Sequence, residues 1–111
     1  MTTRERAMTR GEIWWADLPE PSGRRPVVLL SRNTFYLTRA HILVAEITTT
    51  IRLVPSEVAL GKGDGLDRAC VINTAQLWTI RQDDLDVPIT SLSATKYAAL
   101  DAALAYTLEL D

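Results

Sequence analysis

Apolar residues alternate with polar ones, or run together in short blocks, over most of the chain before residue 81, and this pattern predicts a series of β-strands. The predicted strands are residues 11–18, 26–31, 40–50, 53–60, 69–73 and 76–80. The last two can join into one strand that bends at Thr74 and Ala75. Residues 61–65, Gly-Lys-Gly-Asp-Gly, are predicted to form a hairpin turn, and Pro55 favours an edge position for the strand that contains it.

The C-terminal part of the chain has a helical period instead. One face of the predicted helix consists of Tyr97, Leu100, Leu104 and Leu108. Ser93 is suited to cap the first turn, so we expect a helix over residues 93–110. Residues 32–39 and 81–85 each have room for one short helical turn. Strands in series followed by one helix predict a mainly β (α+β) fold, a small, strongly bent antiparallel sheet or partial barrel closed by the C-terminal helix.

The length of 111 residues predicts one domain. Residues 1–9 are polar and charged without a period, so we expect a flexible N-terminal tail ahead of a single domain over residues 10–111. No apolar run approaches the roughly 20 residues of a membrane-spanning helix, and the N-terminus lacks the apolar core of a secretion signal. We therefore expect a cytoplasmic protein without membrane association, and the single cysteine, Cys70, fits a reducing compartment.

The sequence offers few metal-binding or nucleophilic side chains. Cys70 and His41 are its only cysteine and histidine, which argues against a zinc site built from several such ligands and against a histidine-containing triad. Cys70 lies in an apolar strand and is expected to be inert core. We expect neither a metal nor a cofactor.

The formal net charge of −2 is unevenly distributed. Residues 1–55 hold eight arginines and five carboxylates, whereas residues 56–111 hold four basic residues and nine carboxylates. A polyanion such as a nucleic acid is therefore expected to meet the N-terminal half of the chain.

Two adjacent arginines, Arg24 and Arg25, precede the apolar strand over residues 26–31. Thr48 lies where the long strand over residues 40–50 becomes polar. If these two strands pair antiparallel, Arg25 and Thr48 are neighbours. A forked guanidinium beside a hydroxyl suits a phosphate group. The alternative is purely structural, because an arginine can simply begin a strand and strands favour β-branched residues.

Five short motifs then occur in a fixed order along the chain. They are Arg10-Gly11-Glu12-Ile13-Trp14, Asp17-Leu18, Arg25-Pro26-Val27-Val28-Leu29, Ile47-Thr48-Thr49 and Gln76-Leu77-Trp78-Thr79-Ile80. In this register the chain resembles the MazF/PemK toxins from Arg10 to the end of the C-terminal helix. The resemblance implies an SH3-like, CcdB-type barrel and a homodimer. It further implies sequence-specific, metal-independent cleavage of single-stranded RNA by 2′-OH attack, leaving 2′,3′-cyclic phosphate and 5′-OH ends, and a cognate antitoxin that inhibits the toxin.

The resemblance also assigns residues to the site. In that family the arginine of the Arg-Pro pair and the threonine after the apolar run of the long strand are catalytic, and these fall on Arg25 and Thr48. The candidates for RNA contact are Arg24, Thr49, Asn73 and Gln76.

The chain departs from the family pattern in two places. Some relatives carry an arginine and an acid with acid–base roles before the Gln-x-x-Thr-Ile segment, and the corresponding residues here are Asn73 and Ala75. Glu46 and Glu20 are the nearest acidic substitutes. The loop between the first two strands is also shorter than in many relatives, so the resemblance predicts no cleavage motif.

Two alternatives share the predicted fold. A gyrase poison similar to CcdB would act by binding, but such proteins end their last helix in Trp-Gly-Ile, whereas this chain ends Thr107-Leu108-Glu109-Leu110-Asp111. The other alternative is a catalytically inactive module that has kept only RNA or antitoxin binding.

Overall fold

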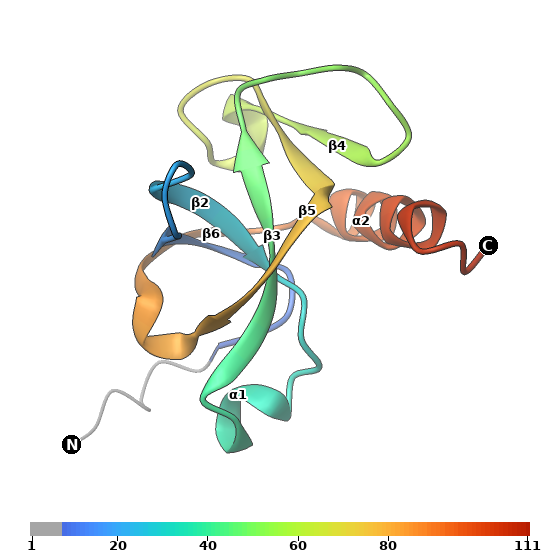
Figure 1. Ribbon diagram of the computed structural model, residues 1–111. Helices are drawn as coiled ribbons and strands as arrows, with labels where there is room; N and C mark the ends of the chain where they lie inside the picture. The colour runs from blue at the N-terminus through green and yellow to red at the C-terminus, as the bar shows by residue number, and fades with distance from the viewer. Residues whose placement is uncertain (1–7) are drawn as a thin grey trace.

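The computed structural model describes residues 8–111, which form one curled antiparallel sheet with a helix at its side (Figure 1). The elements are β1 (Glu12–Asp17), β2 (Arg24–Leu29), α1 (Phe35–Thr38), β3 (His41–Thr48), β4 (Glu57–Leu60), η2 (Lys62–Asp64), β5 (Cys70–Arg81), η3 (Gln82–Asp84), β6 (Leu85–Ser91) and α2 (Ala94–Thr107). The six strands follow the order β4-β5-β3-β2-β1-β6, and every neighbouring pair is antiparallel. The predicted mainly β (α+β) fold is confirmed.

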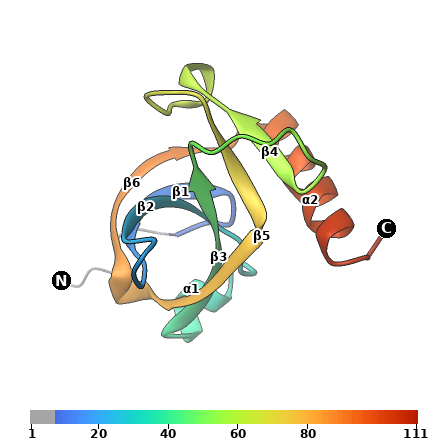
Figure 2. The same ribbon diagram turned by 45° about the horizontal axis from the view of Figure 1, so that its top comes forward.

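The sheet curls until its strands surround a common interior. Figure 2 looks along this curl, with β1, β2, β3, β5 and β6 around it and β4 and α2 together at one side. The tail predicted over residues 1–9 lies outside the described residues except for Met8 and Thr9. Met8 packs against buried core residues, and the Thr9 carbonyl accepts a hydrogen bond from the Glu12 amide at 3.1 Å.

Both faces of the central strands are buried, because each face covers its own core. The core on the side of α2 contains Ile13, Val28, Ala45, Ile47, Ile72 and the helix residues Leu100 and Ala103. The core inside the curl contains Trp14, Val27, Leu29, Val44, Ile80 and Tyr36 of α1. Successive residues of one strand therefore enter different cores, which explains why β2 reads as a continuous apolar run.

The boundaries of β2 and β4 differ from the prediction. β2 begins two residues earlier, because Arg24 and Arg25 pair in register with Asp17 and Ala16 of β1. β4 begins only at Glu57, whose Oε1 accepts the backbone N–H groups of Arg52 and Leu53, each at 3.0 Å. This carboxylate holds the segment before β4 in a turn, so the segment cannot continue the strand.

β6 was not predicted from the sequence pattern, because Asp86 and Pro88 interrupt its apolar residues. The strand lies at the edge of the sheet, where Pro88 pairs with Trp14 of β1. An edge strand tolerates proline because its outer side needs no ladder hydrogen bond.

The C-terminal helix begins as predicted and ends earlier. Ser93 Oγ accepts the Lys96 amide at 3.2 Å, which confirms the cap. The helix ends at Thr107, and Glu109 then adopts a left-handed conformation with φ of 56°. The Leu110 amide donates to the Ala105 carbonyl at 2.8 Å and closes the helix end. Neither α-helix of residues 8–111 is long and apolar enough to cross a membrane.

β5 is one continuous bent strand, so the two strands predicted over residues 69–73 and 76–80 are joined. Its register against β3 shifts between the pairs Ala45–Leu77 and Glu46–Asn73, so residues 74–76 bulge away from β3. At the bend, the buried Thr74 hydroxyl donates to the Ser56 carbonyl at 2.7 Å and lies 2.6 Å from the Thr107 hydroxyl. The bend therefore ties the sheet to the last turn of α2.

Candidate functional site

Antiparallel pairing of β2 and β3 brings Arg25 and Thr48 together, as predicted. The register pairs Val27 with Glu46, so the start of β2 lies beside the end of β3. Arg25 Nη1 donates to Thr48 Oγ1 at 3.4 Å, and the Arg25 side chain is 35% exposed. A permanently charged donor and a hydroxyl thus lie in contact at a site that is partly open to solvent.

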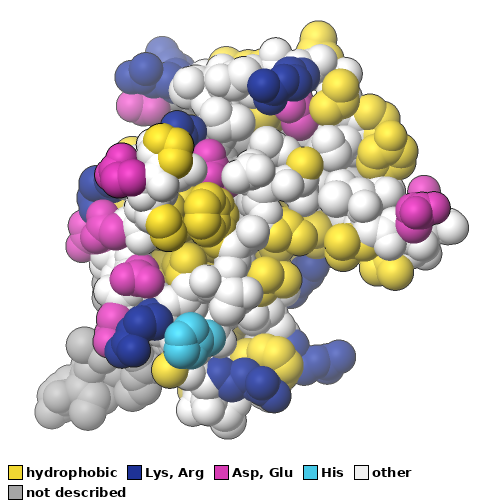
Figure 3. Space-filling model, viewed as in Figure 1, with side chains coloured by type: hydrophobic (Ala, Val, Ile, Leu, Met, Phe, Trp, Pro, Cys, Tyr) yellow, Lys and Arg dark blue, Asp and Glu magenta, His cyan; other side chains and the backbone are white. Residues whose placement is uncertain are grey.

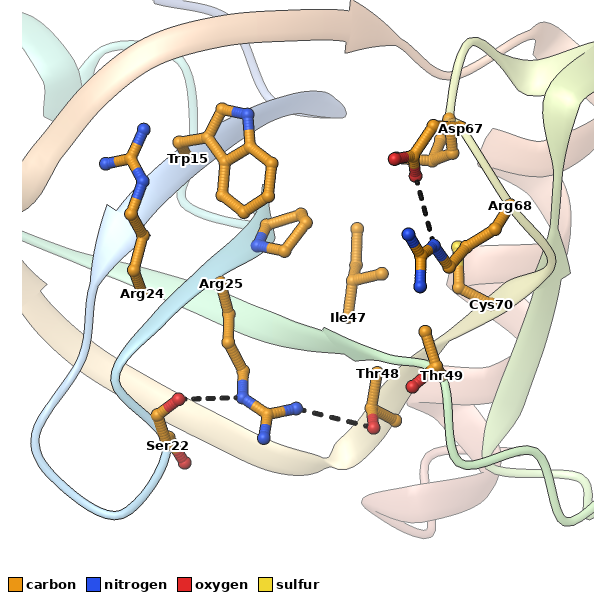
Figure 4. A pocket seen from close by; sticks show the side chains of 12 residues that line it. Trp15, Ser22, Arg24, Arg25, Ile47, Thr48, Thr49, Asp67, Arg68 and Cys70 are labelled. Carbon is orange, nitrogen blue, oxygen red and sulfur yellow. Dashed lines mark hydrogen bonds and ion pairs between the residues drawn. The ribbon is translucent and has the colours of Figure 1, made fainter.

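The Arg25 side chain is anchored by two further groups, of which Figure 4 shows Ser22. Its Nε donates to the Ser22 carbonyl at 2.9 Å, and its Nη1 lies 3.4 Å from Glu46 Oε2. Among residues 8–111, no hydrogen bond or ion pair engages Nη2. The guanidinium is therefore fixed on one side and offers its remaining donors to a ligand.

Glu46, which the sequence offers only as a substitute acid beside Glu20, lies against Arg25 in the structure. Its side chain is 8% exposed, although it carries a carboxylate. Its Oε1 accepts hydrogen bonds from Ser22 Oγ at 3.1 Å and from the Trp78 indole at 3.0 Å. The sequence contains a signal for this arrangement, because Glu46 interrupts the otherwise apolar run of β3. A carboxylate at a buried position needs polar or charged partners.

A cleft of about 360 Å³ opens beside Arg25 (Figure 4). Its apolar lining consists of Trp15, Pro26, Ile47, Leu66 and Cys70. Its polar lining consists of Ser22, Arg24, Arg25, Thr48, Thr49, Asp67 and Arg68. A cleft with this apolar lining and a charged rim can accept a ligand that is flat and apolar at one end and anionic at the other.

Arg24 also reaches the cleft, but carboxylates of its own chain counter its charge. The guanidinium stacks on the Trp15 ring at 5.0 Å from the centroid. It forms an ion pair of 2.7 Å with Asp86 and lies 4.0 Å from Asp17. Acidic side chains gather along this edge of the molecule, at the left in Figure 3. Arg24 is thus a weaker positive site than its position in the sequence indicates.

The other predicted RNA contacts divide into two groups. Thr49 lines the cleft beside Thr48. Asn73 and Gln76 lie on β5 and are not part of the cleft lining, and the Asn73 side chain accepts the Ala75 amide at 3.0 Å. A role for Asn73 and Gln76 in RNA contact stays a prediction.

Cys70 and His41 occupy different parts of the fold. Cys70 lines the cleft but is 4% exposed, and its burial, together with the carboxylates of Asp67 and Asp64, raises the pKa of the thiol. His41 begins β3 at the end opposite Thr48, where it pairs with Arg81. No group of three or more histidine, cysteine or carboxylate side chains within residues 8–111 is arranged to hold a metal ion.

This fold and site define a known class of protein. The family model described as PemK-like, MazF-like toxin of type II toxin–antitoxin systems matches residues 9–108. The chain therefore belongs to this toxin family. The match extends over the whole sheet and α2, and includes Arg25 and Thr48.

Individual relatives agree with the family assignment. Endoribonuclease MazF9 of Mycobacterium tuberculosis is 34% identical over 93% of this chain and 98% of that protein. Endoribonuclease MazF6 of the same organism is 31% identical over the same shares. Probable endoribonuclease MazF5, also of Mycobacterium tuberculosis, is 48% identical, but the match spans only 58% of this chain and 59% of that protein.

Solved structures show the same fold. The structure of Mycobacterium tuberculosis toxin MazF-mt6 matches with a TM-score of 0.83 and 32% identity, over 90% of this chain and 98% of that one. A mycobacterial endoribonuclease in complex with its cognate antitoxin matches with a TM-score of 0.84 and 28% identity, over 95% and 98% of the two chains.

Proposed function

We propose that this chain is an endoribonuclease toxin that cleaves single-stranded RNA at specific sequences without a metal ion. The observation that carries the proposal is the pair formed by Arg25 and Thr48 at the mouth of a cleft. Membership of a toxin family with named endoribonucleases supports it.

The proposed reaction uses a nucleophile that RNA itself carries. The ribose 2′-oxygen forms a bond to the neighbouring phosphorus while the bond from phosphorus to the 5′-oxygen breaks. The 2′-OH loses its proton, and the leaving oxygen gains one. The products are a 2′,3′-cyclic phosphate and a 5′-OH end, so the protein has only to align the groups and stabilise charge.

Arg25 and Thr48 suit these two tasks. The guanidinium stays protonated and presents fixed donors to the phosphoryl oxygens as negative charge develops. Arg25 is a poor base for the same reason. Thr48 is placed to hydrogen-bond the scissile phosphate or the 2′-OH, and its contact with Arg25 holds both groups at one point.

The surroundings of this pair favour a single strand. An unstacked base can enter the cleft beside Trp15, whereas a base within a duplex cannot. Arg24 and Thr49 are proposed to contact RNA in the cleft, and Asn73 and Gln76 to contact it outside. We further propose that the chain acts as a homodimer and that a cognate antitoxin inhibits it, as the antitoxin complex of a mycobacterial relative supports.

The test is to incubate the purified chain with mixed-sequence RNA in excess EDTA. The proposal expects cleavage, with cyclic phosphate at the new 3′ ends and hydroxyl at the new 5′ ends. Cleavage only after divalent metal is added would refute the metal-independent mechanism. Inhibition of topoisomerase without RNA cleavage would instead indicate a gyrase poison, and RNA binding without cleavage an inactive module.

A further inference from the structure

The cleft beside Arg25 has the size and lining of a nucleobase site. Its volume of about 360 Å³ lies within the range of small-ligand sites, roughly 300–1,000 Å³. Trp15 and Pro26 are cross-strand partners on β1 and β2, and Ile47 follows on the neighbouring strand β3, so the three side chains lie side by side along one side of the cleft (Figure 4). Aromatic rings of this kind are where unpaired bases stack.

Two charged side chains stand at the far rim of the same cleft. Asp67 and Arg68 lie between η2 and β5, with Asp67 Oδ1 3.6 Å from Arg68 Nε. Both side chains are more than two-thirds exposed, at 83% and 71%. Their hydrogen-bonding capacity is therefore open to a ligand that enters between them and Trp15.

We propose that this cleft binds a guanine base next to the phosphate held by Arg25. Guanine carries two adjacent acceptors, O6 and N7, which a guanidinium engages in a bidentate manner, and two donors, N1–H and N2–H, which a carboxylate accepts. Arg68 and Asp67 supply this complementary pair. The inference rests on the proposed RNA cleavage and deepens it, because it names the base beside the cut.

The test compares cut sites in a random RNA library for the wild type, Arg68→Ala and Arg81→Ala. Arg81 is the matched control, because it is also an exposed arginine paired to a nearby carboxylate, Asp83, at 3.1 Å, but it lies outside the cleft. We expect guanine at one position flanking the wild-type cut. Arg68→Ala should weaken this preference at least about fivefold at that position alone, whereas Arg81→Ala leaves it unchanged. A wild-type motif without guanine beside the cut, or an unchanged motif in Arg68→Ala, overturns the proposal.

A second experiment separates base recognition from catalysis. Short labelled oligonucleotides with 2′-deoxyribose at every position cannot be cut by 2′-OH attack, and each would carry one guanine or one adenine in a uridine background. The inference expects tighter binding of the guanine oligonucleotide, and loss of that difference in Trp15→Ala or Arg68→Ala. Guanine-selective binding without RNA cleavage would refute the enzyme and keep the base site, whereas cleavage without guanine preference would refute only the base site.

An independent observation concerns the buried carboxylate of Glu46. We infer that Glu46 is a positioning residue for Arg25. Ser22 and Trp78 engage Oε1 at 3.1 and 3.0 Å, which turns Oε2 toward Arg25 Nη1 at 3.4 Å. The buried carboxylate is thus fixed by two neutral donors and in turn fixes the guanidinium. This inference also rests on the proposed function.

Glu46→Gln keeps the acceptor for Ser22 and Trp78 but removes the charge that faces Arg25. We expect kcat for RNA cleavage to fall about tenfold or more while KM changes little, because an interaction that orients a catalytic group acts in the transition state. Glu12→Gln is the matched control, since Glu12 also accepts a tryptophan indole N–H, from Trp14 at 3.0 Å. It should leave kcat unchanged.

A double-mutant cycle decides whether Glu46 acts through Arg25. In an Arg25→Lys background with measurable residual activity, Glu46→Gln should cause a much smaller further loss than in the wild type. Full additivity, or an unchanged kcat in the single variant, overturns the inference. Should Glu46→Gln lower the melting temperature strongly, Trp78→Phe provides a second variant, because it removes one of the donors that orient Glu46 and is expected to lower kcat more mildly.

Discussion

Arg25 Nη1 lies 3.4 Å from the Thr48 hydroxyl, although 23 positions separate the two residues in the sequence. The antiparallel ladder between β2 and β3 creates this contact, with Val28 opposite Ala45 in its centre. Both side chains extend from rigid strands, so their relative position does not depend on a flexible loop.

The proposed cleavage requires both side chains, because each is assigned a separate task at the same phosphate. Arg25→Ala and Thr48→Ala should each lower kcat about 100- to 1,000-fold, the usual cost of removing one transition-state donor. A toxin of this kind is expected to arrest the growth of cells that express it, and both variants should lose that effect. Thr79→Ala is the control, since Thr79 is an exposed threonine of β5 outside the cleft. Wild-type cleavage by both site variants would refute the assignment.

Arg24 should matter less than Arg25, because Asp86 already counters its charge at 2.7 Å. We expect Arg24→Ala to weaken RNA binding modestly, and Asp86→Asn to strengthen it by releasing the guanidinium. Both effects should shrink at high ionic strength, since charges near the surface are screened. Titration of labelled RNA at two salt concentrations measures them, and weaker binding by Asp86→Asn would contradict this account.

The buried hydroxyl of Thr74 should contribute to stability. Thr74→Val preserves the shape of the side chain but leaves the Thr107 hydroxyl without its contact at 2.6 Å. We expect the free energy of unfolding to fall by about 1–3 kcal/mol, the cost of an unmade buried hydrogen bond. Chemical denaturation measures this loss, with Thr79→Val as an exposed control on the same strand.

Gly11 is required by its backbone and by its surroundings. Its φ is +93°, and an added Cβ would lie 2.7 Å from the Tyr97 ring. Gly11→Ala should therefore destabilise the fold by about 1–3 kcal/mol, from backbone strain and local overpacking. Gly63→Ala should be nearly neutral, because nothing lies within 4 Å of its added Cβ. Equal melting temperatures of the two variants would count against this explanation.

The Cys70 thiol should react slowly and only at high pH in the folded protein. Burial raises its pKa, and the carboxylates of Asp67 and Asp64 add to the effect, so the folded state keeps its proton at pH values where the unfolded thiol has lost it. Alkylation requires the thiolate, so its pH profile should lie at higher pH in native than in denatured protein. Ionisation of the unfolded state should also lower stability as pH rises above the ordinary thiol pKa of about 8.5.

The sequence pattern was sufficient for those parts of the fold that depend on local periodicity. The apolar runs of β2 and β3 and the stripe of α2 identified their elements, and antiparallel pairing of β2 with β3 was enough to place Arg25 beside Thr48. β6 was missed because an edge strand with Pro88 lacks the apolar alternation of a central one. β6 forms because it pairs with β1, and this pairing depends on the tertiary fold and not on the local sequence.

The site was predictable only in part, for a similar reason. Arg24 and Arg25 are neighbours in the sequence but have different electrostatic surroundings. Arg24 alone is paired with Asp86, which lies on β6 and is far from it in the sequence. The role of Glu46 depends on Trp78 and Ser22. Pairing of β5 with β3 brings Trp78 to Glu46, and the loop between β1 and β2 brings Ser22 to it. Contacts of this kind have no local signature.

The short loop between β1 and β2 is closed by its own hydrogen bonds and held from the sheet. Leu18 donates to the Gly23 carbonyl at 2.9 Å, the Ser22 amide donates to the Pro19 carbonyl at 3.1 Å, and the Ser22 side chain binds Glu46. Ordering a flexible loop would cost about 1–2 kcal/mol of backbone entropy per residue. Because these hydrogen bonds already hold the loop in one conformation, a ligand or partner that docks against it meets a preformed surface, and its affinity is not reduced by that entropic cost.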